Sequence, residues 1–251
     1  MSDAAPALTR DVFLGGTLGI WQPARGYRAA TDPVLLAAAV AARPGQEVLE
    51  LGCGAGVALL ALGARVPDLV LCGVERQALY AELARRNARD NGLPARIETA
   101  DITALPADLR QGFDHVLINP PYYPPTAPAA TDSGRAAALR EDTPLEIWLD
   151  TALRRLKPGG YLTVIHLAER LPDLLAAIGS RAGAVRVRPL TARAGRAAGR
   201  VLLQARKGAR GPFQLLAPLI LHLGDRHLAD RDDFTPTAQA ILRDGEALRW
   251  D

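Results

Sequence analysis

The chain has 251 residues, of which 49% are hydrophobic and 23% are charged, and its formal net charge is +3. This length is enough for one α/β domain with a continuous core, or for such a domain with a small appendage. Cys53, Cys72 and four scattered histidines exclude a disulfide framework and a paired-ligand zinc site. Since no apolar run reaches membrane-spanning length and no charged-then-apolar leader precedes the fold, we expect one cytoplasmic domain over residues 1–251.

The N-terminal part of the chain combines loop and helix signals. Residues 11–30 carry glycine, proline and alternating apolar residues, which predicts a short β-hairpin or an ordered loop. A helix follows, with Asp32 as its N-cap and Pro33 at a position where a missing N–H costs nothing. We expect this helix to end near Pro44 and Gly45.

Beyond this helix, buried strands alternate with helices along the chain. That alternation predicts βαβ crossovers and a parallel sheet with helices on both faces. The connection into the last strand is short, which indicates that this strand is antiparallel. The predicted fold class is therefore α/β, with a Rossmann-like, mostly parallel sheet of seven strands, followed by a C-terminal extension over residues 211–251. The predicted strands are 46–53, 69–75, 95–101, 113–119, 161–167, 185–190 and 200–208, and the predicted helices are 57–66, 77–90, 144–157 and 171–183.

A glycine-rich turn closes the first of these strands. Dinucleotide-binding turns have glycines at the first, third and sixth positions, whereas Gly52, Gly54 and Gly56 occupy the first, third and fifth. Glu50 precedes them, and its carboxylate suits a cationic sulfonium with an α-amino group better than an anionic pyrophosphate. Gly52 and Gly54 lack a Cβ, so that the backbone can lie close to such a ligand. The alternative is a turn that serves only the strand-to-helix geometry.

Two further acids follow the next two strands. Glu75 ends the second strand, at the distance from the first glycine that is typical of a ribose-binding carboxylate. Asp101 ends the third strand and Ile102 follows it, so this pair can read an adenine amino group and pack on the ring. Each acid alone is more commonly a solvated loop residue. Three acids at three successive strand ends favour a cofactor pocket at the carboxyl edge of the sheet.

The segment Asn119-Pro120-Pro121-Tyr122 directly follows the fourth strand. An sp² amino nitrogen is a poor nucleophile because its lone pair is spread into the ring. The Asn119 side-chain oxygen and the Pro120 carbonyl can accept its two hydrogens and localise the lone pair, and the prolines hold these acceptors in place. Tyr122 can stack on an extruded base. The alternative is a proline-stiffened turn that leaves the sheet.

These motifs together resemble class I, Rossmann-like methyltransferases that act on amino nitrogens. More narrowly, the chain resembles the tRNA1(Val) (adenine-N6)-methyltransferase family from Phe13 to its C-terminus. The resemblance implies S-adenosylmethionine as the cofactor and an adenine N6 beside the tRNA anticodon as the acceptor. The matching segments are Gln22, residues 26–28, Thr31-Asp32, Leu35-Leu36, residues 50–56, 119–123 and 157–160, Leu221-His222, and residues 234–236 and 240–242.

The resemblance also implies a role for each candidate residue. The methionine part of the cofactor would lie on the glycine turn, its ribose on Glu75 and its adenine beside Asp101 and Ile102. The target base would lie against the segment that starts at Asn119. Arg28 and Thr31 would close over the cofactor. The implied cofactor-binding residues are Arg28, Thr31, Glu50, Gly52, Gly54, Glu75, Asp101, Ile102 and Asn119, and the implied catalytic residues are Asn119, Pro120, Pro121 and Tyr122.

Two segments are candidates for contact with tRNA. Residues 181–210 carry a run of arginines with no acid among them, which a phosphate backbone would attract. Residues 124–143, with Arg135 and Arg140, follow the Asn-Pro-Pro-Tyr segment. The alternative for the arginine run is a solvated hairpin in an arginine-biased chain. The charged loop 224–233 lacks the glycine spacing of a calcium loop, so we expect no metal.

Three other functions fit parts of this pattern. Methylation of a glutamine amide in a protein such as a release factor presents a similar planar NH₂, but such enzymes usually have a helical domain before the glycine turn. Methylation of DNA adenine normally requires a separate target-recognition domain, for which we see no segment. A non-catalytic RNA-binding scaffold would have no need for the acceptors of the Asn-Pro-Pro-Tyr segment.

Overall fold

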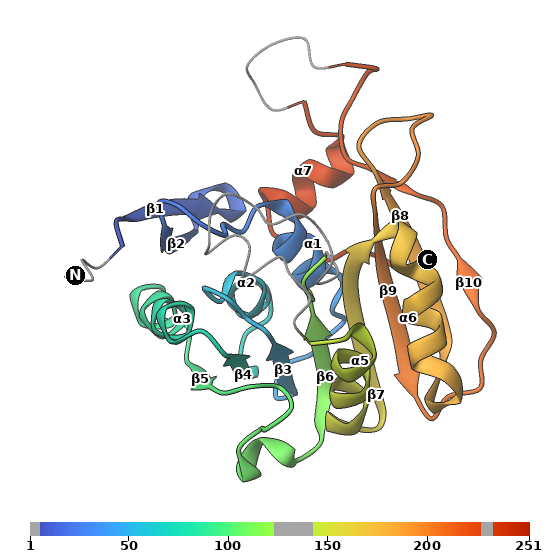
Figure 1. The fold of residues 1–251 in the computed structure, drawn as a ribbon. Helices are drawn as coiled ribbons and strands as arrows, with labels where there is room; N and C mark the ends of the chain where they lie inside the picture. Colours follow the sequence, from blue (N-terminus) through green and yellow to red (C-terminus); the bar gives the residue numbers. More distant parts are fainter. Residues whose placement is uncertain (1–5, 123–142, 227–232) are drawn as a thin grey trace.

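The computed structural model describes most of the chain (Figure 1). Two segments singled out in the sequence fall largely outside the described residues, namely 124–143, which includes Arg135 and Arg140, and the charged loop 224–233. The described residues are 6–122, 143–226 and 233–251.

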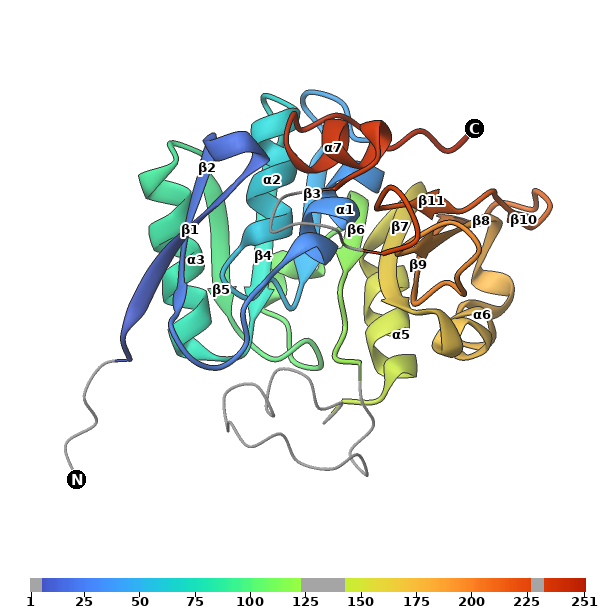
Figure 2. The ribbon, with the colours of Figure 1, turned by 90° about the horizontal axis from the view of Figure 1, so that it is seen from above.

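One mixed sheet forms the centre of the described structure (Figures 1 and 2). Its strands are β3 (Glu47–Leu51), β4 (Val70–Glu75), β5 (Ala95–Thr99), β6 (Phe113–Ile118), β7 (Leu156–Leu167), β8 (Ala182–Thr191), β9 (Arg200–Lys207), β10 (Gln214–Leu215) and β11 (Leu219–Ile220). The spatial order is β10-β8-β9-β7-β6-β3-β4-β5, and β11 also pairs with β8. Each neighbouring pair from β5 through β7 is parallel, whereas β9 is antiparallel to both β7 and β8. The predicted Rossmann-like α/β fold is confirmed, and β9, the last of the seven predicted strands, is antiparallel as expected. The sheet also has β10 and β11, which the sequence does not predict, so within the described residues it has nine strands instead of seven.

Helices cover both faces of this sheet (Figure 2). Successive side chains of a strand point to opposite faces, and β3 shows this, because Val48 enters one core and Leu49 and Leu51 enter the other. The first core also contains residues of α1, α2, α3 and α7, and the second contains residues of α5 and α6. The helices are α1 (Thr31–Ala39), α2 (Val57–Arg65), α3 (Ala78–Asp90), α5 (Leu145–Arg155), α6 (Leu171–Ile178) and α7 (Pro236–Leu242), with 3-10 turns η1 (Leu14–Gly16), η2 (Ala107–Arg110), η3 (Ala168–Arg170) and η4 (Gly179–Arg181).

The N-terminal segment contains a hairpin, formed by β1 (Leu8–Phe13) and β2 (Leu18–Pro23), where the sequence indicates either a hairpin or an ordered loop over residues 11–30. Two asparagines of α3 and its C-cap satisfy the backbone of β2. Asn87 accepts from the Trp21 N–H at 2.8 Å and donates to the Trp21 carbonyl at 3.1 Å, and Asn91 bonds the N–H and carbonyl of Gly19 in the same way at 3.0 and 2.7 Å. The side chains that end α3 therefore fasten the hairpin to the main fold.

The helix α1 differs from the sequence-based expectation at both ends. Asp32 is not its N-cap, because the helix starts at Thr31, with Ala30 in the capping position. The helix also ends at Ala39, before Pro44, because the backbone turns extended at Val40. Arg65 donates to the carbonyl of Val40 at 2.6 Å, and the Trp250 indole donates to that of Ala39 at 2.8 Å. Side chains distant in sequence thus donate hydrogen bonds to carbonyl groups at the end of the helix.

The end of the chain is built into the same core. The two-residue strands β10 and β11 run parallel to β8, and Thr235 caps α7 by accepting from the Ala238 N–H at 3.2 Å. The side chains of Ile241, Leu248 and Trp250 are buried against the core that contains α1 and α2. No helix in the described part of the chain combines the length and apolar character needed to span a bilayer.

Candidate active site

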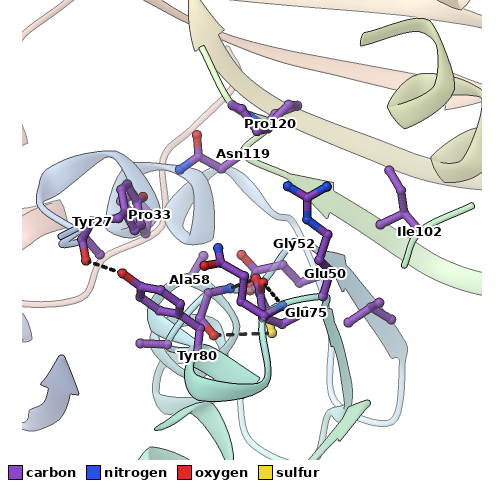
Figure 3. A pocket seen from close by; sticks show the side chains of 18 of the residues that line it. Tyr27, Pro33, Glu50, Gly52, Ala58, Glu75, Tyr80, Ile102, Asn119 and Pro120 are labelled. Atoms are coloured by element: carbon purple, nitrogen blue, oxygen red, sulfur yellow. Dashed lines mark hydrogen bonds between the residues drawn. The ribbon is translucent and has the colours of Figure 1, made fainter. Parts of the chain in front are cut away.

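A cavity lies at the carboxyl ends of β3, β4 and β6 (Figure 3). Parallel strands bring the residues that follow them to one edge of the sheet, so segments distant in sequence meet there. Figure 3 shows Asn119 and Pro120 on one side of the cavity and Glu50, Gly52 and Glu75 on the other. The sequence-predicted residues that line it are Glu50, Gly52, Gly54, Glu75, Asp101, Ile102, Asn119, Pro120, Pro121 and Tyr122.

Arg28 and Thr31 are not among the residues that line this cavity, although Tyr27, Ala29 and Pro33 are. The Arg28 guanidinium instead pairs with Asp11 of β1 at 2.6 Å. Thr31 is the first residue of α1. In this structure, neither of the two residues predicted to close over the cofactor therefore lines the cavity.

The glycine-rich turn between β3 and α2 has left-handed backbone at Gly52, Gly54 and Gly56, with φ of 71°, 53° and 86°. A Cβ on Gly52 would lie 2.6 Å from the ring of Trp148, so this glycine makes room for α5. A Cβ on Gly54 would meet nothing within 4 Å. Only Gly54 therefore faces open space, where a ligand can approach the backbone.

Two buried carboxylates line the floor of the cavity. Glu50 accepts from the Leu59 N–H at 2.9 Å, and Glu75 accepts from the N–H groups of Gly54 and Gln77 at 3.0 and 2.8 Å. Burial raises the pKa of both side chains above the ordinary value for glutamate. A cationic ligand would favour the ionised form of both acids, which fits a sulfonium compound with an amino group.

Asp101 and Ile102 follow β5 at the rim of the same cavity. Asp101 accepts from the hydroxyl and the N–H of Thr103 at 2.6 and 2.8 Å, and these bonds lower the pKa of its carboxyl. Ile102 is buried beside it. An ionised acceptor next to an apolar surface is the combination that an adenine ring requires.

The Asn119-Pro120-Pro121-Tyr122 segment begins directly after β6 and lines the side of the cavity opposite the acids. The hydroxyl of Tyr122 lies 2.8 Å from Oδ1 of Asn119 and 2.8 Å from Oδ2 of Asp32. Burial, and then the negative charge of Asp32, raise the pKa of this hydroxyl, which therefore stays protonated. Arg200 pairs with Asp32 at 3.1 Å.

The ring of Tyr122 also has protein neighbours. The Arg200 guanidinium lies over it, 4.7 Å from its centre, and His166 meets it edge-on at 5.3 Å between centroids. Only 9% of Tyr122 is exposed. The structure therefore gives this tyrosine a set of internal contacts in addition to the stacking on a base that the sequence predicts.

The sequence did not mark several residues of this site. Tyr27 and Tyr80 line the cavity, and the Tyr80 hydroxyl donates to the Tyr27 carbonyl at 3.0 Å. Tyr80 occupies a buried position of an amphipathic helix and has the pattern of a core residue. Asp32 and Arg200 meet across 168 positions of sequence, and no local spacing signals such a contact.

The arginine run of residues 181–210 is largely engaged within the protein. Arg181 pairs with Asp150 at 2.6 Å, and Arg193 pairs with Asp233 at the same distance, with only 12% of its side chain exposed. Arg188 donates to three backbone carbonyls of the C-terminal segment. Among the arginines of this run, all of which the structure describes, Arg186, Arg196 and Arg210 have no ion pair or side-chain hydrogen bond.

Within the described residues, no group of three or more His, Cys, Asp or Glu side chains could hold a metal ion.

The chain is similar to a known protein family, to a named relative and to solved structures. The methyltransferase small domain family model matches residues 30–176. A relative from Dickeya chrysanthemi named tRNA1(Val) (adenine(37)-N6)-methyltransferase is 33% identical over 226 residues, which cover 85% of each chain. A solved structure from Agrobacterium tumefaciens, described as a predicted O-methyltransferase, is 30% identical with a TM-score of 0.69, over 87% of this chain and 98% of its own. A T. thermophilus 16S rRNA methyltransferase in complex with AdoMet and guanosine shares the fold, with a TM-score of 0.57 and 20% identity, over 80% of this chain and 50% of its own.

Proposed function

The chain belongs to the methyltransferase small domain family and is an S-adenosylmethionine-dependent methyltransferase, and from this premise we propose that it methylates the exocyclic N6 of an adenine in tRNA, next to the anticodon. The observation that carries the proposal is that Asn119 and Pro120 line the same cavity as the buried acids Glu50 and Glu75. One cavity thus combines a place for a cationic methyl donor with acceptors for an amino group.

The residues of the cavity suit each part of the cofactor. When bound, S-adenosylmethionine supplies a methyl group on a positively charged sulfur. Glu50 and the open backbone at Gly54 would hold its methionine part, Glu75 its ribose, and Asp101 with Ile102 its adenine.

The Asn119 segment suits an amino acceptor. The carboxamide oxygen of Asn119 and the carbonyl of Pro120 can accept the two hydrogens of the amino group, which localises its lone pair on nitrogen. The two prolines fix the backbone of the segment, so that the acceptors need not reorganise during the reaction. Orientation of the nitrogen toward the methyl group is then the main contribution of the protein.

The proposed substrate is supported by the relative from Dickeya chrysanthemi, whose name gives adenine N6 of tRNA as its acceptor. Arg186, Arg196 and Arg210 offer charge for a phosphate backbone on the surface of the arginine run. We propose tRNA as the partner of this surface and of the segment 124–143.

The experiment that tests the acceptor is methyl transfer from radiolabelled S-adenosylmethionine to total tRNA, DNA and a release-factor protein, each followed by analysis of the labelled residue. We expect label in tRNA as N6-methyladenosine. Label in protein glutamine or in DNA adenine would replace the proposal with one of the alternatives. Absence of transfer to any of them, with intact cofactor binding, would favour a scaffold.

The change Asn119→Ala should lower kcat about 100- to 1000-fold, the range seen when one preorganised partner of a reacting group is removed. The affinity for S-adenosylmethionine, measured by calorimetry, should stay within a few-fold, because the acids of the cofactor end are unchanged. Asp11→Asn is a matched control, since it alters a polar side chain outside the cavity. Full activity of Asn119→Ala would exclude the proposed role of the amide.

A further inference from the structure

The hydroxyl of Tyr122 is placed between two groups that cannot both receive its hydrogen. Its oxygen lies 2.8 Å from Oδ2 of Asp32 and 2.8 Å from the amide atom of Asn119 that the structure assigns as Oδ1. A phenol has one hydrogen, so it donates one hydrogen bond and accepts others with its lone pairs. One of the two neighbours must therefore be its acceptor, and the other should be a donor.

Asp32 is the better acceptor of the two. It forms an ion pair with Arg200, whose Nε donates to the same Oδ2 atom at 3.1 Å. A carboxylate only accepts hydrogen bonds, and bonds to an ionised acceptor are roughly twice as strong as neutral ones. If Tyr122 donated to Asn119 instead, lone pairs of the hydroxyl and of Asp32 would face each other at 2.8 Å with no hydrogen between them.

The orientation of the Asn119 amide follows from this proton count. An amide oxygen and nitrogen fill nearly the same space, so a half-turn exchanges them and the hydrogen-bond network decides between the two orientations. With the Tyr122 hydrogen on Asp32, an Asn119 oxygen at 2.8 Å from the Tyr122 oxygen would leave two acceptors face to face. The amide is therefore a half-turn from the orientation assigned in the structure, and its NH₂ donates to the Tyr122 oxygen. The carboxamide oxygen of Asn119 is then left to accept a hydrogen from a substrate.

We propose that Asp32, held by Arg200, is a positioning residue that acts through the Tyr122 hydroxyl to turn the oxygen of the Asn119 amide toward the amino group to be methylated. The opposite orientation would present an NH₂ to an NH₂, which is repulsive and withdraws one acceptor from the reacting nitrogen. The identity of that nitrogen rests on the proposed function, whereas the proton arrangement rests only on the geometry of these four side chains.

The kinetic test compares Asp32→Ala with Asp32→Asn. Asp32→Ala removes the acceptor, so Tyr122 donates to Asn119 and the amide reverses. We expect a fall in kcat of about 10- to 100-fold, below the cost of losing the Asn119 acceptor outright. Asp32→Asn should recover activity to within about threefold of the wild type, because Arg200 holds its carbonyl oxygen toward Tyr122. Cofactor affinity should change little in both, and Asp11→Ala serves as the matched control for loss of an arginine-paired acid.

A second comparison separates orientation from general structure. In a Tyr122→Phe background the link to Asn119 is already cut, so Asp32→Ala should have almost no further effect on kcat. Equal losses in Asp32→Ala and Asp32→Asn would overturn the proposal, as would an undiminished effect of Asp32→Ala in the Tyr122→Phe background.

Neutron diffraction of the deuterated wild-type protein decides the proton arrangement without any substrate. We expect deuterium on the Tyr122 oxygen directed at Asp32, and an ND₂ group of Asn119 directed at Tyr122. Deuterium directed from Tyr122 to Asn119 would refute the inference even if every Asp32 variant failed to fold. A wild-type chain that leaves tRNA adenine unmethylated would remove the proposed function, while the neutron result would still stand or fall by itself.

Discussion

Glu50 and Glu75 are buried carboxyl groups of the cavity, and their burial disfavours the ionised form of each. Both acids are buried, and each raises the pKa of a neighbouring group through its charge as well as having its own pKa raised by burial. Their hydrogen bonds come from backbone N–H groups of Leu59, Gly54 and Gln77. A positively charged ligand would therefore stabilise the ionised forms of both carboxyl groups.

This arrangement predicts that the affinity for S-adenosylmethionine rises with pH. An acid with a raised pKa is partly protonated below that pKa, and a cation binds the ionised form, so binding releases protons. Calorimetry in buffers of different ionisation enthalpy should detect this release. Glu75→Gln should weaken binding about tenfold or more, because it removes the ionised acceptor of the ribose hydroxyls. S-adenosylhomocysteine, which lacks the sulfonium charge, should show a weaker pH dependence. Affinity that is independent of pH for both ligands would show that these acids do not meet the cofactor's charge.

At the scale of elements, the arginine run of residues 181–210 contains side chains that are similar in sequence but differ in their contacts within the protein. Arg193 lies in the connection between β8 and β9, where it pairs with Asp233 and also donates to the Leu223 carbonyl. Arg196 belongs to the same connection, but its guanidinium has no ion pair or hydrogen bond among the described residues. From sequence alone both are candidates for contact with RNA, because charge and spacing do not reveal which guanidinium is used inside the protein.

The two arginines should therefore differ when each is replaced by alanine. Arg193→Ala should lower the free energy of unfolding by about 1–3 kcal/mol, since it removes an ion pair from Asp233 and the hydrogen bond to the Leu223 carbonyl. Arg196→Ala should leave the unfolding curve unchanged and should reduce the slope of log affinity for tRNA against log salt. Urea unfolding and binding at several salt concentrations measure the two effects. An unchanged salt slope in Arg196→Ala would exclude this residue from the RNA surface.

Most elements of the fold follow from local sequence, and the exceptions have physical causes. The strands β3 through β9 are apolar enough to be recognised from pattern. The two-residue strands β10 and β11 are too short to show an alternation of apolar and polar residues. They form by pairing with the edge of β8 that β9 leaves open. The end of α1 depends on Arg65 and Trp250, which lie far along the chain. The cavity acids were visible at strand ends, but the link from Asp32 to Tyr122 and Arg200 required the folded topology.

At the scale of the whole molecule, the sheet holds neutral histidines in its interior as well as the acids of its carboxyl edge. His115 on β6 and His166 on β7 are both fully or almost fully buried. Nε2 of His115 meets Gln46 at 3.1 Å while its Nδ1 has no partner among the described residues, and Nδ1 of His166 accepts from the Leu167 N–H at 2.8 Å. A second ring proton on His115 would thus lie on the buried Nδ1 without an acceptor. A second ring proton on His166 would lie on Nδ1 and point at the N–H of Leu167.

These histidines predict a loss of stability as the pH falls. Burial lowers the pKa of each to about 4, from 6.5 in the unfolded chain. Between these values the unfolded chain binds more protons than the native one, so the free energy of unfolding rises with pH and falls on acidification, by up to about 1.4 kcal/mol per pH unit for each histidine. The raised pKa values of Glu50 and Glu75 act in the opposite direction above about pH 4.5, so the difference between wild type and His115→Gln isolates the histidine contribution. In urea unfolding from pH 7 to pH 5, the free energy of unfolding should fall less with pH in His115→Gln than in the wild type. Parallel curves for the two proteins would contradict the assignment of a buried neutral ring to His115.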